Sequence, residues 1–265
     1  MKGRVLIIAG SDPSGGAGVQ ADIKTVTALG GYAAAAITSL TVQNTLGVKS
    51  VHPVAPAVIR AQIEAVLEDI GADAIKIGMI GEAGAAEAIT AALEARAKGV
   101  SVVLDPVLAA TSGGALAAPE MVPVLMKRLL PLAALVTPNA EEAAALTGRP
   151  MRGEDDLAAA GAALVEAGAK AALVKGGHLE GETVSDALAT GGGAVFFRNP
   201  RIVTTSTHGT GCTLASAVAA GLAQGAALEE SVGRAIAYVR EAMRTAPGFG
   251  KGHGPLNHAH PFRKP

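Results

Sequence analysis

The chain has 265 residues, of which 49% are hydrophobic and 17% are charged. This balance supplies a large apolar core and excludes an intrinsically disordered chain. The net charge of −1 gives no basic field to attract nucleic acid, and aromatic residues, which stack on single strands, make up only 2%. We therefore expect a globular protein without a nucleic-acid partner.

Signals for export or membrane insertion are missing from the sequence. Cys212 is the single cysteine, which excludes an intrachain disulfide. Residues 1–9 are too short for a signal sequence and fit a first strand better. No apolar stretch reaches the 18 residues that a membrane span needs. We expect a soluble, cytoplasmic protein with no membrane partner.

Short apolar runs alternate with longer, alanine-rich amphipathic segments. No internal repeat and no long linker interrupts them, so we expect one domain over residues 1–265. The short runs predict strands at 4–9, 33–39, 74–77, 100–104, 135–136, 171–174, 184–189 and 194–197. Apolar residues at helical spacing predict helices at 17–29, 56–69, 82–98, 139–147, 155–167, 210–224 and 228–245.

This alternation is typical of an α/β fold made of parallel βαβ units with helices on both faces of the sheet. The closely spaced strands within 184–197 predict an antiparallel hairpin at one edge. Ligands of such sheets bind beyond the carboxyl ends of the strands. Polar and glycine-rich clusters follow the predicted strands that end at Ala9, Leu104, Val136 and Val174. The sequence therefore predicts a site along this edge.

The first cluster, residues 10–18 (GSDPSGGAG), is rich in glycine. Glycines let the backbone approach a ligand closely, and the helix that follows presents free N–H groups. The spacing matches neither a Walker A loop, which needs Gly-Lys-Ser/Thr, nor the dinucleotide fingerprint. A ligand-binding loop and an ordinary glycine-rich turn both fit this motif alone.

The second cluster, residues 207–213 (THGTGCT), opens a predicted helix. Its backbone N–H groups point at one spot, and the helix dipole favours negative charge there, so we expect an anion hole. Cys212 would lie in the first turn, where the pKa of a thiol is lowered. We interpret Cys212 as a candidate catalytic group, against the alternative of a small buried hydrophobe.

A third set of polar side chains stands just past predicted strand ends. Carboxylates suit a magnesium ion that keeps waters and is completed by phosphate oxygens, and a lysine balances phosphate charge. Helix capping also explains an asparagine followed by glutamate. Taken with the anion hole, the set predicts phosphoryl transfer. Its members are Asp105, Thr137, Asn139, Glu141 and Lys175.

Over nearly its full length the chain resembles the hydroxymethylpyrimidine and hydroxymethylpyrimidine phosphate kinases of thiamine synthesis. Eight motifs in the family's order carry this resemblance. They are AGSDPSGGAGVQADIKT (9–25), SLTVQNTLGV (39–48), KIGMI (76–80), DPV (105–107), TPNAEEA (137–143), VKGGH (174–178), HGTGCTLASA (208–217) and GHGPLNH (252–258).

The resemblance implies a ribokinase-like three-layer αβα sandwich and a homodimer. It also implies a small-molecule pyrimidine substrate, ATP and Mg²⁺. Two successive phosphorylations would take place in one pocket, first of the hydroxymethyl group and then of the resulting phosphate ester.

The family's site roles carry over to matching positions of this sequence. Asp22 would lie near the hydroxymethyl group, and Gln43 would read the ring nitrogen and the exocyclic amine. The pyrimidine pocket would be lined by Gly10, Ala17, Asp22, Val42, Gln43 and Met79.

The phosphate side of the site carries over in the same way. Gly209, Gly211 and Cys212 would form the anion hole, and Asp105 and Glu141 would lie on the magnesium side. The nucleotide phosphates would meet Lys175, Thr137, Asn139 and Thr210.

Three other functions stay open. A pyridoxal or pyridoxine kinase has an overlapping pocket signature. A Rossmann oxidoreductase is disfavoured because the glycine spacing fails and no acidic residue is placed for a ribose. A non-catalytic pyrimidine-binding regulator is disfavoured because residues 209–212 and the carboxylates Asp105 and Glu141 are intact.

Overall fold

The protein is described here by a computed structural model that covers residues 1–108 and 121–262. Within these residues the strands form one sheet in the order β3-β2-β1-β4-β5-β6-β7-β8-β9. Pairing is parallel from β2 to β7 and antiparallel at both edges. The strands are β1 (Arg4–Ser11), β2 (Tyr32–Asn44), β3 (Gly47–Pro53), β4 (Ala74–Ile77), β5 (Ser101–Leu104), β6 (Ala133–Val136), β7 (Ala171–Lys175), β8 (Thr183–Thr190) and β9 (Gly193–Pro200).

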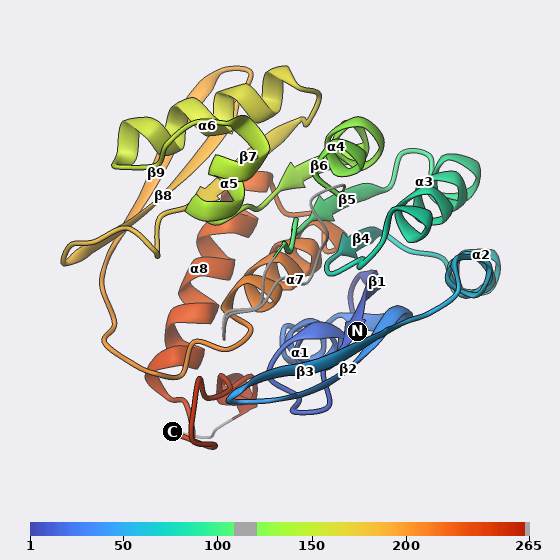
Figure 1. The fold of residues 1–265 in the computed structure, drawn as a ribbon, viewed down its shortest axis with the longest axis horizontal. Coiled ribbons are helices and arrows are strands. Elements are labelled where there is room, and N and C mark those ends of the chain that lie inside the picture. The colour runs from blue at the N-terminus through green and yellow to red at the C-terminus, as the bar shows by residue number, and fades with distance from the viewer. Residues whose placement is uncertain (109–120, 263–265) are drawn as a thin grey trace.

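Helices cover both faces of this sheet (Figure 1). One face carries α1, α7 and α8, and the other carries α2, α3 and α4. This arrangement confirms the predicted three-layer αβα sandwich. The helices are α1 (Gly18–Ala28), α2 (Pro56–Asp69), α3 (Ala83–Arg96), α4 (Met121–Val124), α5 (Ala140–Thr147), α6 (Glu154–Glu166), α7 (Thr210–Ala223) and α8 (Leu228–Arg244).

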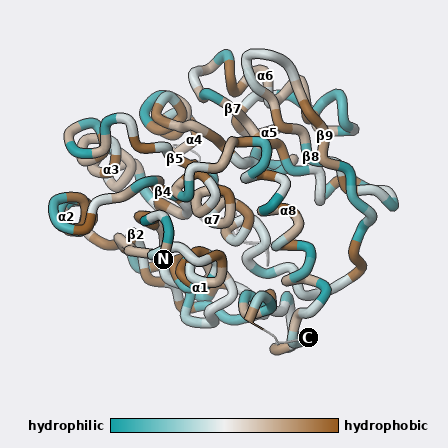
Figure 2. Tube along the Cα trace, turned by 180° about the vertical axis from the view of Figure 1, so that it is seen from behind, coloured by the Kyte–Doolittle hydropathy of each residue, from teal (hydrophilic) through white to brown (hydrophobic). Residues whose placement is uncertain are grey.

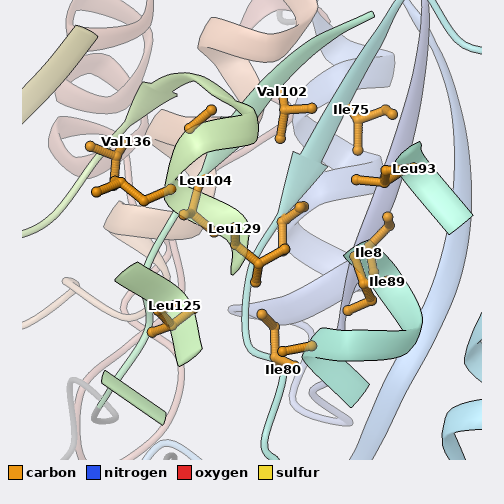
Figure 3. Packing of buried hydrophobic residues seen from close by; sticks show 14 of the residues in the cluster. Ile8, Ile75, Ile80, Ile89, Leu93, Val102, Leu104, Leu125, Leu129 and Val136 are labelled. Atoms are coloured by element: carbon orange, nitrogen blue, oxygen red, sulfur yellow. The ribbon is translucent and has the colours of Figure 1, made fainter. Parts of the chain in front are cut away.

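The two cores are built by the alternation of side chains along the central strands. In β1, Leu6 and Ile8 belong to the core under α2 and α3, whereas Val5 and Ile7 belong to the core under α1 and α7. Figure 3 shows Ile8 packed with strand and helix neighbours in the first core. Full burial of each such aliphatic side chain contributes about 1.5–3 kcal/mol. The central strands are thereby held from both sides.

Amphipathic helices close these cores from outside. In Figure 2, α2 is hydrophilic on one side and hydrophobic on the other. Its Ile59 and Ile63 are buried against the sheet, whereas Arg60 faces solvent. No helix in the described part of the chain is long and apolar enough to cross a membrane.

Most predicted elements are confirmed, and the hairpin at 184–197 is confirmed as β8 and β9. The sequence analysis missed β3, the edge partner of β2, because its segment carries the polar residues Lys49, Ser50 and His52. It also missed the helical stretch that begins with α4 and continues through a π-helical turn at Leu125–Leu129. Pro123 and Pro131 obscured the helical signal there.

The segment that follows α8 and includes His253 and Gly254 returns to the edge of the sheet where the parallel strands end. In Figure 1 it lies beside the tip of the β2–β3 hairpin. The backbone N–H of His253 donates to the carbonyl oxygen of Thr45 at 2.9 Å. The backbone N–H of His208 donates to the carbonyl oxygen of Gly254 at 3.1 Å. The segment therefore ties the hairpin to the turn before α7.

Candidate active site

The turn that begins α7, residues 209–212, packs directly on the glycine-rich loop after β1. Gly209 has φ 81°, in the left-handed region. A Cβ on Gly209 would collide with the carbonyl oxygen of Gly16, so only glycine fits. The first two motifs found in the sequence, almost two hundred residues apart, thus form one structure.

Asp12 organises the glycine-rich loop from inside. Its Oδ1 accepts from the backbone N–H of Ser14 at 2.9 Å, and its Oδ2 accepts from that of Ala17 at 2.9 Å. The imidazole Nε2 of His208 lies 2.8 Å from the same Oδ2. Although burial alone would raise it, the hydrogen bonds from His208 and Ser14 lower the pKa of Asp12. Neither Asp12 nor His208 was predicted, although both lie inside quoted motifs.

Gly10 and Met79, both predicted to line the pyrimidine pocket, are neighbours in the structure. A Cβ on Gly10 would stand 3.2 Å from the sulfur of Met79 and 2.9 Å from the hydroxyl of Ser39, so these three residues are tightly packed. Thr38 donates its hydroxyl to the carbonyl oxygen of Met79 at 2.6 Å, which holds that backbone in place.

Gln43 reaches the same region from β2. Its Nε2 lies 3.4 Å from Nε2 of His208, and its Oε1 accepts from the hydroxyl of Thr41 at 3.1 Å. The β2–β3 pairing shifts register between Val42 and Gln43, an irregularity that re-aims side chains. Val42 is 47% exposed, so its surface is available to a ligand.

Asp22 lies deeper than the resemblance implied. Its side chain has no exposed surface, and both carboxylate oxygens are occupied. Oδ2 accepts from Nζ of Lys76 at 2.8 Å, and Oδ1 accepts from the hydroxyl of Ser216 at 2.7 Å. Contact between Asp22 and a substrate hydroxymethyl group is therefore not supported. The distant partners Lys76 and Ser216 could not be paired with it from sequence.

Asp105 and Lys175 meet on the other side of the turn at residues 209–212, where we predicted an anion hole. Nζ of Lys175 lies 3.3 Å from Oδ1 of Asp105, and the hydroxyl of Thr137 donates to the same oxygen at 3.1 Å. Thr137 is fully buried, so it orients Asp105 and does not face a ligand. A Cβ on Gly211 would lie 3.1 Å from Nζ of Lys175, which places the turn against this pair.

Glu142, and not Glu141, is the acidic neighbour of this pair. Glu141 is exposed, whereas Glu142 is buried. Asn139 caps α5: its Oδ1 accepts from the N–H of Glu142 at 2.8 Å, and Glu142 accepts from the N–H of Asn139 at 2.8 Å. This capping box, Asn-x-x-Glu, is a sequence signal that identifies Glu142 as the inward residue. The prediction that Glu141 faces the metal side is wrong.

Burial raises the pKa of Glu142 to about 7, although the charge of Lys175 pulls in the opposite direction. For Lys175, burial lowers the pKa, but Asp105 and Glu142 raise it further, so the ammonium keeps its charge. The site thus holds one cation between two carboxyl groups, one of which resists ionisation.

Cys212 lies half-buried in the first turn of α7, where we predicted a lowered pKa. Burial instead raises the pKa of the thiol to about 11, and the positive charge of Lys76 offsets only part of this. The residue does lie at the start of α7 as predicted, but the pKa of its thiol is raised and not lowered. Thr210 and Gly211 precede Cys212 in the same turn and are also half-buried.

A comparison with known proteins identifies the family. The family described as phosphomethylpyrimidine kinase matches residues 12–257. The chain belongs to this family. The hydroxymethylpyrimidine/phosphomethylpyrimidine kinase of Rhizobium meliloti is 47% identical over 98% of each chain. The thiamine biosynthesis bifunctional protein ThiED of Geobacter sulfurreducens is also 47% identical, and the chain spans about half of it, 52%.

Solved structures agree on the fold. The pyridoxal kinase from Staphylococcus aureus in complex with ADP is similar with a TM-score of 0.90 and 33% identity, covering 98% of this chain and 94% of that one. The phosphomethylpyrimidine kinase from Clostridium difficile is similar with a TM-score of 0.80 and 40% identity, covering 91% and 99%. The predicted ribokinase-like kinase family is therefore confirmed.

Proposed function

We propose that the chain transfers a phosphoryl group from ATP to hydroxymethylpyrimidine and then to the resulting monophosphate. The observation that carries this proposal is the position of the anion-hole turn, residues 209–212, between Asp105 with Lys175 and the loop at residues 10–18. The names of full-length relatives and the ADP complex of a structural neighbour support the substrate class and the nucleotide.

Each group has a distinct task in this account. Gln43 reads the ring through an amide that both donates and accepts. Backbone N–H groups of Gly211 and Cys212 hold the transferring phosphoryl group, and Lys175 neutralises the phosphates of the nucleotide. Because phosphoryl transfer passes through a loose transition state, positioning and charge neutralisation supply most of the catalysis. Val42 and Gly10 contribute apolar walls to the pyrimidine pocket.

Magnesium fits the acidic side of this site. No group of three or more His, Cys, Asp or Glu side chains gathers in the described ranges, so a metal ion there would need phosphate oxygens and waters as well. Asp105 and Glu142 would hold it, and a divalent cation there would offset the burial that raises the pKa of Glu142. Bound magnesium would neutralise charge on the phosphates.

We propose that the protein is a homodimer and that it works in the cytoplasm. Leu40 and Leu46 are large apolar residues exposed along β2 and its hairpin. Such a patch supports a homodimer, which sedimentation equilibrium would test. A cytoplasmic location is proposed because nucleotide-dependent synthesis takes place where ATP is available.

Pyridoxal phosphorylation is a second candidate activity, because several structural neighbours are pyridoxal kinases. A steady-state comparison separates the two activities. We expect kcat/KM for hydroxymethylpyrimidine to exceed that for pyridoxal by at least about tenfold, since one buried amide contact discriminates by about 1–3 kcal/mol. A preference for pyridoxal would overturn the proposed substrate.

A further inference from the structure

Lys76 is a buried cation that the proposed function leaves without a task. It lies in β4 with no exposed surface, and it forms an ion pair with the equally buried Asp22, with Nζ 2.8 Å from Oδ2. Within the described residues, Asp22 is the one hydrogen-bond partner of this ammonium group. An apolar pair of similar volume is often as stable as a buried ion pair, so stability alone does not account for the charges.

The ammonium group is directed toward the active site. A Cβ on Gly78, two residues farther along the chain, would stand 2.7 Å from Nζ of Lys76. Gly78 follows the carboxyl end of β4, which is the edge where the site lies. The missing side chain at Gly78 thus leaves room for Nζ beneath that edge.

Two helix N-termini place this charge under the anion-hole turn. Ser216 of α7 donates to Asp22 of α1 at 2.7 Å. Cys212 lies four residues before Ser216 in α7, and Gly18 lies four residues before Asp22 in α1. Cys212 and Gly18 are therefore each one helical turn nearer to the N-terminus of their helix than Ser216 and Asp22 are. The backbone N–H of Gly18 lowers the pKa of the Cys212 thiol, so the two residues are neighbours. Cys212 and Gly18 therefore form a layer directly above Asp22 and Ser216.

The electrostatics follow the same geometry. Burial raises the pKa of the Cys212 thiol, Lys76 lowers it, and Asp22 and Asp105 raise it to a smaller extent. Lys175 also interacts with Cys212. Because Lys76 has a larger effect than Asp22, the two charges together stabilise negative charge at the turn.

We infer that Lys76 is a positioning residue that supplies a fixed positive charge beneath residues 209–212, and that Asp22 tethers it there. This charge stabilises negative charge at the Cys212 sulfur and on a phosphoryl group held by the turn. The inference rests on the proposed function, in which that turn binds the transferring group. Lys76 acts through the turn and does not touch the substrate.

The test replaces the charges while keeping the packing. Lys76→Met with Asp22→Asn removes both charges, and Ser216→Ala is the matched control, because it loosens the same cluster but keeps Lys76 charged. Cys212 is the only cysteine, so its alkylation by iodoacetamide at pH 9, followed by mass spectrometry without metal or substrate, reports the field at the sulfur. Steady-state kinetics gives kcat and KM separately.

For the double variant we expect alkylation to slow by about threefold or more, kcat to fall by about tenfold, and KM for both substrates to stay within about twofold. Ser216→Ala should remain close to wild type in all of these. Wild-type alkylation and kcat in the double variant, or equal losses in Ser216→Ala, would overturn the inference.

A second neutral pair, Lys76→Met with Asp22→Leu, covers the case in which the first does not fold, because an apolar pair needs no hydrogen-bond partners. If neither pair gives a cooperative thermal transition, the charges serve folding and the inference is wrong. Because alkylation needs no substrate, it also separates this inference from the proposed function. An altered alkylation rate in an enzyme that does not use hydroxymethylpyrimidine would overturn only the latter.

Discussion

Nε2 of His208 lies 2.8 Å from Oδ2 of Asp12, and this contact joins the turn that begins α7 to the loop that follows β1. Both side chains are buried. The same ring nitrogen stands 3.4 Å from Nε2 of Gln43. One histidine therefore connects the turn that begins α7, the glycine-rich loop and the proposed reader of the pyrimidine ring.

Replacing this histidine should loosen the pocket more than the nucleotide site. His208→Ala leaves the buried carboxylate of Asp12 without one partner, which costs about 1–3 kcal/mol of folding free energy. We expect a higher KM for the pyrimidine and a nearly unchanged KM for ATP. His208→Gln, whose amide can donate to Asp12, should recover most of the loss in thermal unfolding and kinetics. Failure of this variant to do better than alanine would contradict the positioning role.

Gln43→Ala should weaken use of the pyrimidine by about 2–3 kcal/mol in kcat/KM, because a buried polar edge of the ring loses its partners. ATP affinity should barely change. Steady-state kinetics with each substrate varied in turn checks this. An equal loss for both substrates would show that Gln43 serves the structure of β2.

The neighbouring glutamates offer a matched pair of variants. Glu142→Gln should raise the magnesium concentration needed for half-maximal activity by about tenfold or more, since a carboxylate ligand is lost. Glu141→Gln removes an equal charge from the exposed side of α5 and should leave the magnesium requirement unchanged. Magnesium titrations of the initial rate decide between them. A shift in Glu141→Gln alone would restore the prediction made from sequence.

His258 should make stability depend on pH. Burial, together with the charge of Lys24, lowers the pKa of His258 to about 4, and its Nε2 lies 3.0 Å from the hydroxyl of Thr213. Between the unfolded value near 6.5 and about 4, the unfolded chain binds a proton that the folded chain does not. This contribution to stability is present above pH 6.5 and is lost as the pH falls toward 4.

Denaturant unfolding at pH 4.5 and 7 measures this effect. The wild type should lose free energy of unfolding between pH 7 and pH 4.5. We expect this loss to be smaller by about 2 kcal/mol in His258→Gln. The exposed His52→Gln should keep the wild-type loss. If His258→Gln lost as much stability as the wild type, groups other than His258 would be responsible for the destabilisation at acidic pH.

Cys212→Ala keeps the backbone N–H of the anion hole and removes a thiol whose pKa is about 11. We expect both phosphorylation steps to slow by less than about tenfold and to a similar degree, because the protonated thiol is a poor base. Separate assays with the alcohol and with the monophosphate check this. A loss of about 10²–10⁴-fold confined to the alcohol step would show that the thiolate acts as a general base.

Much of the fold was predictable because the central strands are continuous apolar runs. The strand at 74–77 and the helix at 56–69 match β4 and α2. β3 was missed because an edge strand needs no apolar pattern to be held in place. The clusters near Gly10, Asp105, Lys175 and Gly209 were also predictable, since glycines and charges at strand ends mark the ligand edge.

The errors at the site have two physical causes. The roles of Asp22 and Glu141 depended on which way a helix faces the sheet, and the partner that occupies Asp22, Lys76, lies 54 positions away in sequence. The capping-box pattern that begins at Asn139 would have identified Glu142, and not Glu141, as the inward residue. For Cys212, only the packed structure shows that burial raises the pKa of the thiol by more than the charge of Lys76 lowers it.

Product analysis by phosphorus NMR tests the central claim most directly. The purified chain is incubated with ATP, magnesium and hydroxymethylpyrimidine, and a parallel sample contains pyridoxal instead. The account predicts a monophosphate ester that rises first and is then converted to the diphosphate, with much slower product formation in the pyridoxal sample. Absence of both pyrimidine products, or phosphorylation of pyridoxal alone, would contradict it.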